Sequence, residues 1–235
     1  MARGIRNGLR RAVLAVLAVL LVAAGAAGAA DEAKMTYVEY QLVAFGLAPE
    51  SFMAQPKKLW RVGDSHLRLE EAVNRETNEQ RLIVVAQPDI WVIERISKRG
   101  RHERDPGPTY KVRFPVFAGD PNDELTKLEM GSEVEYFRER GAKDVGEKTI
   151  AGVTCNESAT EVGGRKLSLF TRKADGVPFQ VVLTVGEKAF AIRYLRFERG
   201  LAVDKSLFVP PAGVTIEEAP KAEPAPAPAP APAPK

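Results

Sequence analysis

The sequence predicts a mainly β domain: a strongly curved antiparallel sheet of about ten or eleven strands, an open or half barrel, with a few short helices covering its concave face. Three observations support this. Apolar and polar residues alternate with period two through most of residues 37–199. Short glycine-containing turns join consecutive strand-like runs, as in β-hairpins. One stretch, at residues 120–141, shows the helical period instead.

The first half of the domain is expected to consist of strands and tight turns. A short turn, Gly63-Asp64-Ser65, predicts a hairpin between two of these strands. In the last expected strand, Tyr110–Phe117, every second residue is apolar, which predicts one buried face and one solvent-exposed face. The expected strands are Tyr37–Phe45, Leu59–Val62, His66–Glu70, Arg81–Ala86, Ile90–Ile96, Arg101–Asp105 and Tyr110–Phe117.

A helical segment is expected between Asp120 and Gly141. Apolar residues recur there near the helical period, at Leu125, Leu128, Val134 and Phe137. Gly131 and Ser132 are expected to divide the segment into two short helices, because Ser132 and Glu135 have capping-box spacing.

Two further hairpins are expected in the second half. Gly163-Gly164 joins Gly152–Val162 to Arg165–Arg172, and Gly186-Glu187-Lys188 joins Phe179–Val185 to Phe190–Arg199. Paired glycines favour the positive φ angles of two-residue hairpin loops. Consecutive hairpins predict antiparallel neighbours.

The first thirty residues have the three zones of a secretory signal peptide: four arginines, an apolar run over 12–21, and small residues over 22–30. We expect cleavage near Ala30 and a periplasmic location. No Cys lies near that site, so a lipoprotein is not expected. A retained membrane anchor is the alternative, because residues 12–30 are uncharged. A twin-arginine signal at Arg10-Arg11 is another.

The mature chain is expected to form one domain, residues 31–218, followed by a tail. Residues 219–235 are rich in Ala and Pro, which alternate from Pro224 to Pro234. This composition favours extended polyproline II and a disordered tail, with a stiff spacer as the alternative. Removal of the four leader arginines leaves 30 of the 34 basic residues, against 31 acidic residues, so the mature chain is close to neutral. A near-neutral domain has no electrostatic reason to bind nucleic acid, so that partner is not expected.

The residues with catalytic chemistry are sparse, and no enzyme is expected. His66 and His102 lack metal-site spacing, so no metal or cofactor is predicted. Asp64-Ser65-His66 has the letters of a catalytic triad, but sequence neighbours in a turn are expected to point apart. The lone cysteine, Cys155, is expected to be a small buried residue on a strand, with a reactive thiol as the alternative.

One basic cluster suggests an anionic contact. It consists of Lys98, Arg99, Arg101 and Arg104, beside His102. Such a cluster suits anionic lipid headgroups or an acidic partner. The alternative is a solvated hairpin whose charge is balanced by Glu103 and Asp105.

Several segments together resemble the LolA-like group of periplasmic proteins, relatives of the outer-membrane lipoprotein-sorting carriers. The likeness spans roughly residues 35–216. The segments are Pro56-Lys-Lys-Leu-Trp-Arg-Val-Gly63, Leu128-Glu-Met-Gly-Ser-Glu133, Ile150-Ala-Gly-Val-Thr-Cys155, Asp175-Gly-Val-Pro178, Asp204-Lys-Ser-Leu-Phe208 and Pro210-Pro-Ala-Gly213. The resemblance implies an open barrel whose apolar hollow is capped by helices and, in the carriers, takes lipoprotein acyl chains.

The sequence therefore predicts a periplasmic, non-enzymatic binding protein for a lipid, acyl chain or lipoprotein. The alternatives are an envelope interaction or sensory module with a filled core, which binds another envelope protein, and an undetected hydrolase. Residue alternation selects the candidates for an apolar lining, whose alternative role is ordinary core packing. They are Leu67, Leu69, Trp91, Ile93, Tyr110, Val112 and Phe114.

Overall fold

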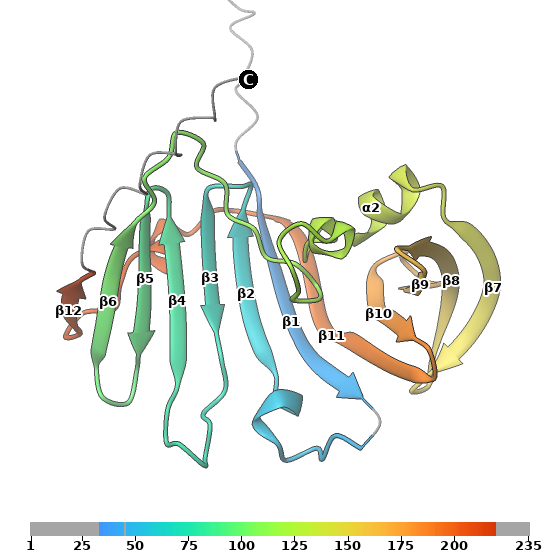
Figure 1. Ribbon diagram of the computed structural model, residues 1–235, viewed down its shortest axis with the longest axis horizontal. Coiled ribbons are helices and arrows are strands. Elements are labelled where there is room, and N and C mark those ends of the chain that lie inside the picture. The colour runs from blue at the N-terminus through green and yellow to red at the C-terminus, as the bar shows by residue number, and fades with distance from the viewer. Residues whose placement is uncertain (1–32, 45, 220–235) are drawn as a thin grey trace, which may run out of the picture. The chain divides into compact units, whose positions relative to one another are not determined.

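The computed structural model describes residues 33–44 and 46–219 and contains one sheet of twelve strands (Figure 1). The expected signal segment, residues 1–30, and the tail from residue 220 onward lie outside the described residues. The strands are β1 (Met35–Ala44), β2 (Lys57–Val62), β3 (His66–Glu70), β4 (Arg81–Ala86), β5 (Asp89–Glu94), β6 (Arg99–Arg104), β7 (Lys143–Ile150), β8 (Val153–Val162), β9 (Arg165–Arg172), β10 (Pro178–Val185), β11 (Lys188–Leu201) and β12 (Thr215–Glu218).

The sheet is open, with the strand order β12-β6-β5-β4-β3-β2-β1-β11-β10-β9-β8-β7. Neighbours pair antiparallel, except that β12 runs parallel to β6. Figure 1 shows the sheet curling so that β7 to β10 turn toward α2. The prediction of a mainly β, curved and largely antiparallel sheet is confirmed. The expected hairpin turns at Gly63 and at Gly163-Gly164 are present, and these glycines have positive φ angles.

Two strands of the sheet were not expected from the sequence, and they lie at its two edges. In β7, Lys143 through Thr149 are exposed, so no buried side of the strand leaves an alternating pattern. The other strand, β12, has four residues and pairs in parallel with β6, which lies far from it in the sequence. An edge strand with both faces in water carries little of the period-two signal used to find strands.

The expected strand Tyr110–Phe117 is wrong. This segment belongs to the strap, which we define as residues 105–132, between β6 and α2. The strap crosses the concave face as extended chain before η2 (Glu124–Lys127), and its one bridge among the described residues joins Pro115 to Glu129. Of the strap's four prolines, Pro115 removes an amide donor within the expected strand, and Pro106 and Pro108 remove two just before it.

The helical segment forms where expected, in two pieces. A 3-10 helix, η2 (Glu124–Lys127), is followed by α2 (Glu133–Glu139), which ends before Gly141 at φ +61°. Short 3-10 turns also occur at η1 (Phe52–Ala54) and η3 (Lys205–Phe208). The capping box is wrong: the Ser132 hydroxyl donates to the carbonyl of Glu129 at 3.1 Å.

The main core lies between the concave face of the sheet and the layer formed by α2, η2 and the strap. Its centre includes Leu59, Leu128 and Phe137, all almost fully buried. Two smaller clusters lie on the opposite, convex face, one around Phe208 of η3 and the other around Leu82 of β4. No helix among residues 33–44 and 46–219 is long and apolar enough to cross a membrane.

Candidate functional site

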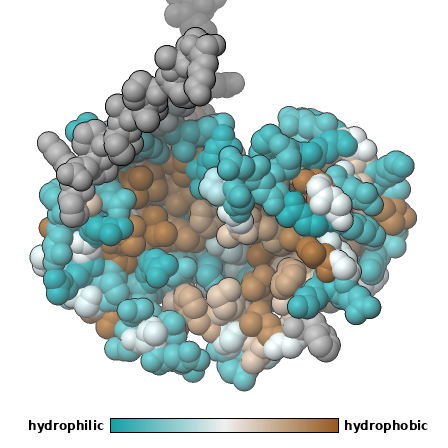
Figure 2. Space-filling view, in the orientation of Figure 1, coloured by the Kyte–Doolittle hydropathy of each residue, from teal (hydrophilic) through white to brown (hydrophobic). Residues whose placement is uncertain are grey.

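The concave face has two halves that differ in how they are covered. Under α2 and η2 the interior is filled, because Phe137 and Leu128 are 2% and 0% exposed against the buried Leu167 and Val181. Over β3 to β5 no helix formed by residues 33–44 and 46–219 covers the sheet, and hydrophobic side chains gather in a hollow of the surface there (Figure 2). The open half is the part of this face that has space for a ligand.

The floor of the open half consists of inward side chains of β3, β4 and β5. Leu67 and Leu69 of β3 are buried. Their cross-strand neighbours on β4 continue the row, and Ile83 and Ile90 remain partly exposed while packing on the same core. This row is the apolar strip of the concave face.

The strap borders the apolar strip on one side. The Val112 N–H donates to the Asp64 carbonyl at 2.7 Å, and the Met130 N–H donates to the Phe114 carbonyl at 3.0 Å. Val112 is buried and Phe114 is half-buried against the main core. The first hydrogen bond attaches the strap to the β2–β3 turn, and the second joins two parts of the strap, which together form a side wall.

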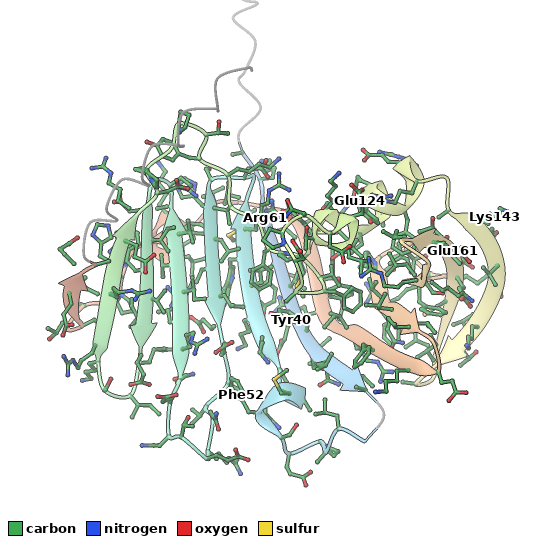
Figure 3. The ribbon with its side chains drawn as sticks, viewed as in Figure 1. Tyr40, Phe52, Arg61, Glu124, Lys143 and Glu161 are labelled. Carbon is green, nitrogen blue, oxygen red and sulfur yellow. The ribbon has the colours of Figure 1, made fainter. Side chains whose placement is uncertain are left out.

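Arg61 fastens the strap to the end of β2 (Figure 3). Its Nε donates to the Gly63 carbonyl at 2.7 Å, and its Nη2 donates to Asp64 Oδ1 at 2.8 Å. Its Nη1 lies 2.6 Å from Glu129 Oε2, on the far part of the strap. The side chains of Arg61 and Glu129 are 12% and 10% exposed. A largely buried ion pair therefore connects the sheet to the strap.

Charged and polar contacts also fasten η2 and α2. Arg165 of β9 holds Asp123, the N-cap of η2, through two hydrogen bonds of 2.6 and 2.7 Å. These hydrogen bonds, with the amide of Leu125, lower the pKa of Asp123 to about 2. Arg199 of β11 pairs with Glu135 of α2 at 3.1 Å. The helical cover is thus attached to the sheet at the start of η2 and in the first turn of α2.

A buried acid lies under the start of α2. Glu133 is 0% exposed and accepts hydrogen bonds from the Tyr194 hydroxyl at 2.5 Å and from the Gly131 N–H at 2.8 Å. Burial raises the pKa of the Glu133 carboxyl, and the two hydrogen bonds only partly oppose this. Its Oε2 has no hydrogen-bond partner among the described residues. The position favours an uncharged acid.

A cavity of about 430 Å³ opens beside the apolar strip, at the end of β5 and the start of β6. Val92 lies between Ile83 and Arg101 in the cross-strand register and lines the cavity with Phe52, which is at the end of the domain away from Arg61 (Figure 3). The cavity is therefore continuous with the apolar floor.

The charges around this cavity are mixed. Arg81, Arg99 and Arg101 line it together with four glutamates, Glu71, Glu79, Glu94 and Glu217. Arg99 pairs with Glu217 at 2.5 Å, and Arg101 pairs with Glu103. The carboxylate of Glu94 accepts backbone N–H groups, led by that of Gln80, which lower its pKa to about 2. The arginines are thus matched by acids in this conformation.

The structure separates the predicted basic cluster. Arg99 and Arg101 face the cavity, whereas Lys98 lies in the β5–β6 turn with φ +55°. Arg104 lies opposite Asp89 at the other end of β6. Two members of the cluster therefore lie at the candidate site and two lie away from it.

The predicted apolar lining is also divided. Leu67, Leu69, Val112 and Phe114 belong to the concave face. Trp91 and Ile93 lie on the convex face beside Leu82, so placing them with Leu67 in one hollow is wrong. Tyr110 is 45% exposed and its ring packs over Gly107, at φ +69°, where a Cβ would lie 3.0 Å from the ring.

Asp64, Ser65 and His66 do not form a catalytic triad. The Ser65 hydroxyl oxygen lies 2.8 Å from His66 Nδ1, so these two residues meet, contrary to the expectation that they point apart. Asp64, however, pairs with Arg61 and Lys111 and does not orient the histidine. Among residues 33–44 and 46–219, no three His, Cys, Asp or Glu side chains converge as metal ligands do.

Comparison with known proteins gives matches among solved structures, all at low identity. No protein-family model and no curated protein matches this chain. An uncharacterised conserved protein from Thermus thermophilus matches 80% of this chain and 91% of its own, with 10% identity and a TM-score of 0.45. The Pseudomonas aeruginosa MucA/MucB complex matches 77% of this chain at 12% identity, with a TM-score of 0.41, and this chain spans 57% of that one.

A LolA superfamily protein from Nitrosomonas europaea matches 77% of this chain and 91% of its own, with 8% identity and a TM-score of 0.28. At these identities and TM-scores we take no function from the matched proteins and argue from this chain's own residues.

The sequence reasoning missed three inward residues of the open half, Ile83, Ile90 and Val92, and the fastening role of Arg61. Ile83 and Ile90 were within expected strands, but β4 and β5 are apolar on both faces. The cross-strand register with the amphipathic β3 would have identified which residues of β4 and β5 point inward, because cross-strand partners share a face.

Proposed function

We propose that this protein is an exported, periplasmic, non-enzymatic binding protein that holds the acyl chain of a lipid or lipoprotein on the open half of its concave face. The apolar strip supports this proposal: Ile83 and Ile90 stay partly exposed on a concave surface between the strap and the cavity at Val92. Partly exposed, concave apolar surface of this kind is typical of ligand sites.

The magnitude of burial sets the class of ligand. Sheltering about ten methylenes stabilises the complex by about 8 kcal/mol. Association and ordering offset about half of this or more. A chain of this length or longer therefore binds usefully, whereas a short one does not. The arginines at the cavity would meet a polar or anionic end of the ligand only if their glutamate partners moved aside.

A fluorescent fatty-acid probe, with mass spectrometry of lipids that co-purify from the envelope, tests this proposal. The variant Ile90→Glu should weaken probe binding by at least about tenfold, because it puts a charge against the chain. Val145→Glu is the matched control, since Val145 is 55% exposed on β7, away from the site. If no acyl species co-purifies and the probe does not bind, the proposal is wrong.

A second candidate is an envelope interaction module with a filled core. The half of the interior under α2 favours it, because Phe137 and Leu128 leave no room there. The probe assay separates the two candidates: a module of this kind takes up no acyl chain, and Ile90→Glu then leaves the probe signal unchanged.

A further inference from the structure

The edge of β6 is covered by a short strand whose geometry differs from the rest of the sheet. β12 adds to β6 in parallel, with Thr215 to Glu218 facing Arg99 to His102. The Thr215 N–H donates to the Lys98 carbonyl at 2.9 Å, and the Ala219 N–H donates to the His102 carbonyl at 2.8 Å. Main-chain pairing of this kind is how extended peptides add to a sheet edge.

An apolar socket on β6 receives one side chain of β12. A Cβ on Gly100 would lie 2.9 Å from both Ile216 Cδ1 and Ile93 Cγ1. Any larger residue at position 100 would therefore displace Ile216. The missing side chain of Gly100 makes the socket, Ile93 lines it, and Trp91 packs on the same hydrophobic cluster.

Two basic side chains of β6 meet the next two residues of β12. Arg99 pairs with Glu217 at 2.5 Å, and His102 Nδ1 lies 2.8 Å from Glu218. The other ring nitrogen of His102 lies 2.9 Å from Asp89, so both nitrogens face carboxylates. Burial lowers the pKa of His102, but these carboxylates raise it more. The edge therefore selects an apolar residue followed by two acids.

β12 itself is weakly held. Thr215, Glu217 and Glu218 are exposed, and Ile216 is the one residue of the strand that enters a hydrophobic cluster. A segment with few buried contacts opens at a small fraction of the global free energy of unfolding. The site on β6 can thus be vacated while the rest of the sheet stays folded.

We propose that the edge of β6 is a strand-addition site for an extended segment of a partner protein in which an apolar residue precedes two acidic residues, and that β12 fills this site from within the chain. The partner segment is acidic because Arg99 and His102 are the side chains that would meet it. The partner's apolar side chain enters the socket at Gly100.

The test uses the full chain and a fluorescent peptide with the sequence of residues 213–219. Ile216→Asp removes the internal competitor from the socket, so this variant should bind the peptide about tenfold or more tightly than the wild type. Hydrogen exchange of residues 215–219 measures release of β12. Val209→Asp is the matched control, because Val209 is 52% exposed before β12 and does not enter the socket; its peptide affinity should match the wild type.

Two changes should abolish binding to the Ile216→Asp variant: lysines in place of both peptide glutamates, and Arg99→Glu in the protein. Peptide binding that is undetectable while β12 exchanges freely would overturn the proposal, as would equal binding of the lysine peptide. A concentration-dependent dimer formed without peptide, by exchange of β12 between copies, would overturn the assignment to a partner protein.

Discussion

Glu133 shows how one residue links the helical cover to the sheet. It is buried at the start of α2, and it accepts a hydrogen bond from Tyr194 of β11. Tyr194 is buried too, and Arg199 is the charged group that acts on the carboxyl from the same strand. Ionisation at this position places a charge in the core, which is costly without a close counterion.

The raised pKa of Glu133 predicts a pH-dependent stability. A carboxyl whose folded pKa lies above its ordinary value of about 4.3 stabilises the fold below that value, and the contribution is lost as pH rises through the raised pKa. The urea midpoint of the wild type should therefore fall, relative to Glu133→Gln, as pH rises from about 4.3 through the raised pKa. Urea titrations of both proteins measure this. Parallel pH profiles would contradict it.

At the scale of the element, the strap is held by charge more than by its own hydrogen-bond ladder. It has one β-bridge, and its prolines prevent a continuous strand. Arg61 compensates by binding both the turn after β2 and Glu129 near the end of the strap. A side wall built in this way can open without unfolding the sheet.

Arg61→Ala should therefore loosen the strap. The change leaves the Glu129 carboxylate without its close partner in a largely buried position, which costs about 3–5 kcal/mol. Arg113→Ala is the control, because Arg113 is 56% exposed and 3.9 Å from Glu129, and its loss should cost less than about 1 kcal/mol. Urea unfolding and hydrogen exchange of residues 105–132 measure both effects. Equal effects of the two changes would show that Arg61 does not fasten the strap.

For the domain as a whole, stability comes from one sheet with a core on one side and two smaller clusters on the other. Cys155 lies within this sheet on β8, fully buried between β7 and β9. Burial raises the pKa of its thiol. Thiolate formation and access both require opening of the sheet, so the thiol is a reporter of global unfolding.

Alkylation of Cys155 by a maleimide should be slow in the native protein and should rise with urea in step with unfolding. The native rate should be at least about a thousandfold below that of the unfolded chain. Val145→Cys in a Cys155→Ala background supplies the exposed comparison on the neighbouring strand and should react rapidly without urea. Fast labelling of native Cys155 would show that β8 opens locally.

Much of the sheet follows from local pattern. The turn at Gly63 and the paired glycines at 163 and 164 place hairpins where a positive φ is needed, and the amphipathic β3 identifies Leu67 and Leu69 as inward. The helical period places η2 and α2 correctly. These features depend on residues close together in the chain, which is why the sequence predicts them.

The strap and the facing of β5 depend on distant residues. Tyr110–Phe117 alternates as a strand does, but it pairs only briefly, with residues 128–130 of the strap, and does not join the sheet. Arg61 and Asp64 hold the strap across the face instead. β5 is apolar on both sides, so register with β4 alone puts Ile90 inward and Trp91 outward. A period of two defines two faces without stating which one is covered.

The sequence by itself determined the fold class, most of the strands and the short helices, because each is encoded by spacing within a few residues. Tertiary structure alone decided that the interior is filled under α2, that no helix of the described residues covers β4 and β5, and that β12 covers the edge of β6. These outcomes depend on which distant surfaces meet and how completely they fill the space between them, and neither quantity is contained in a local pattern.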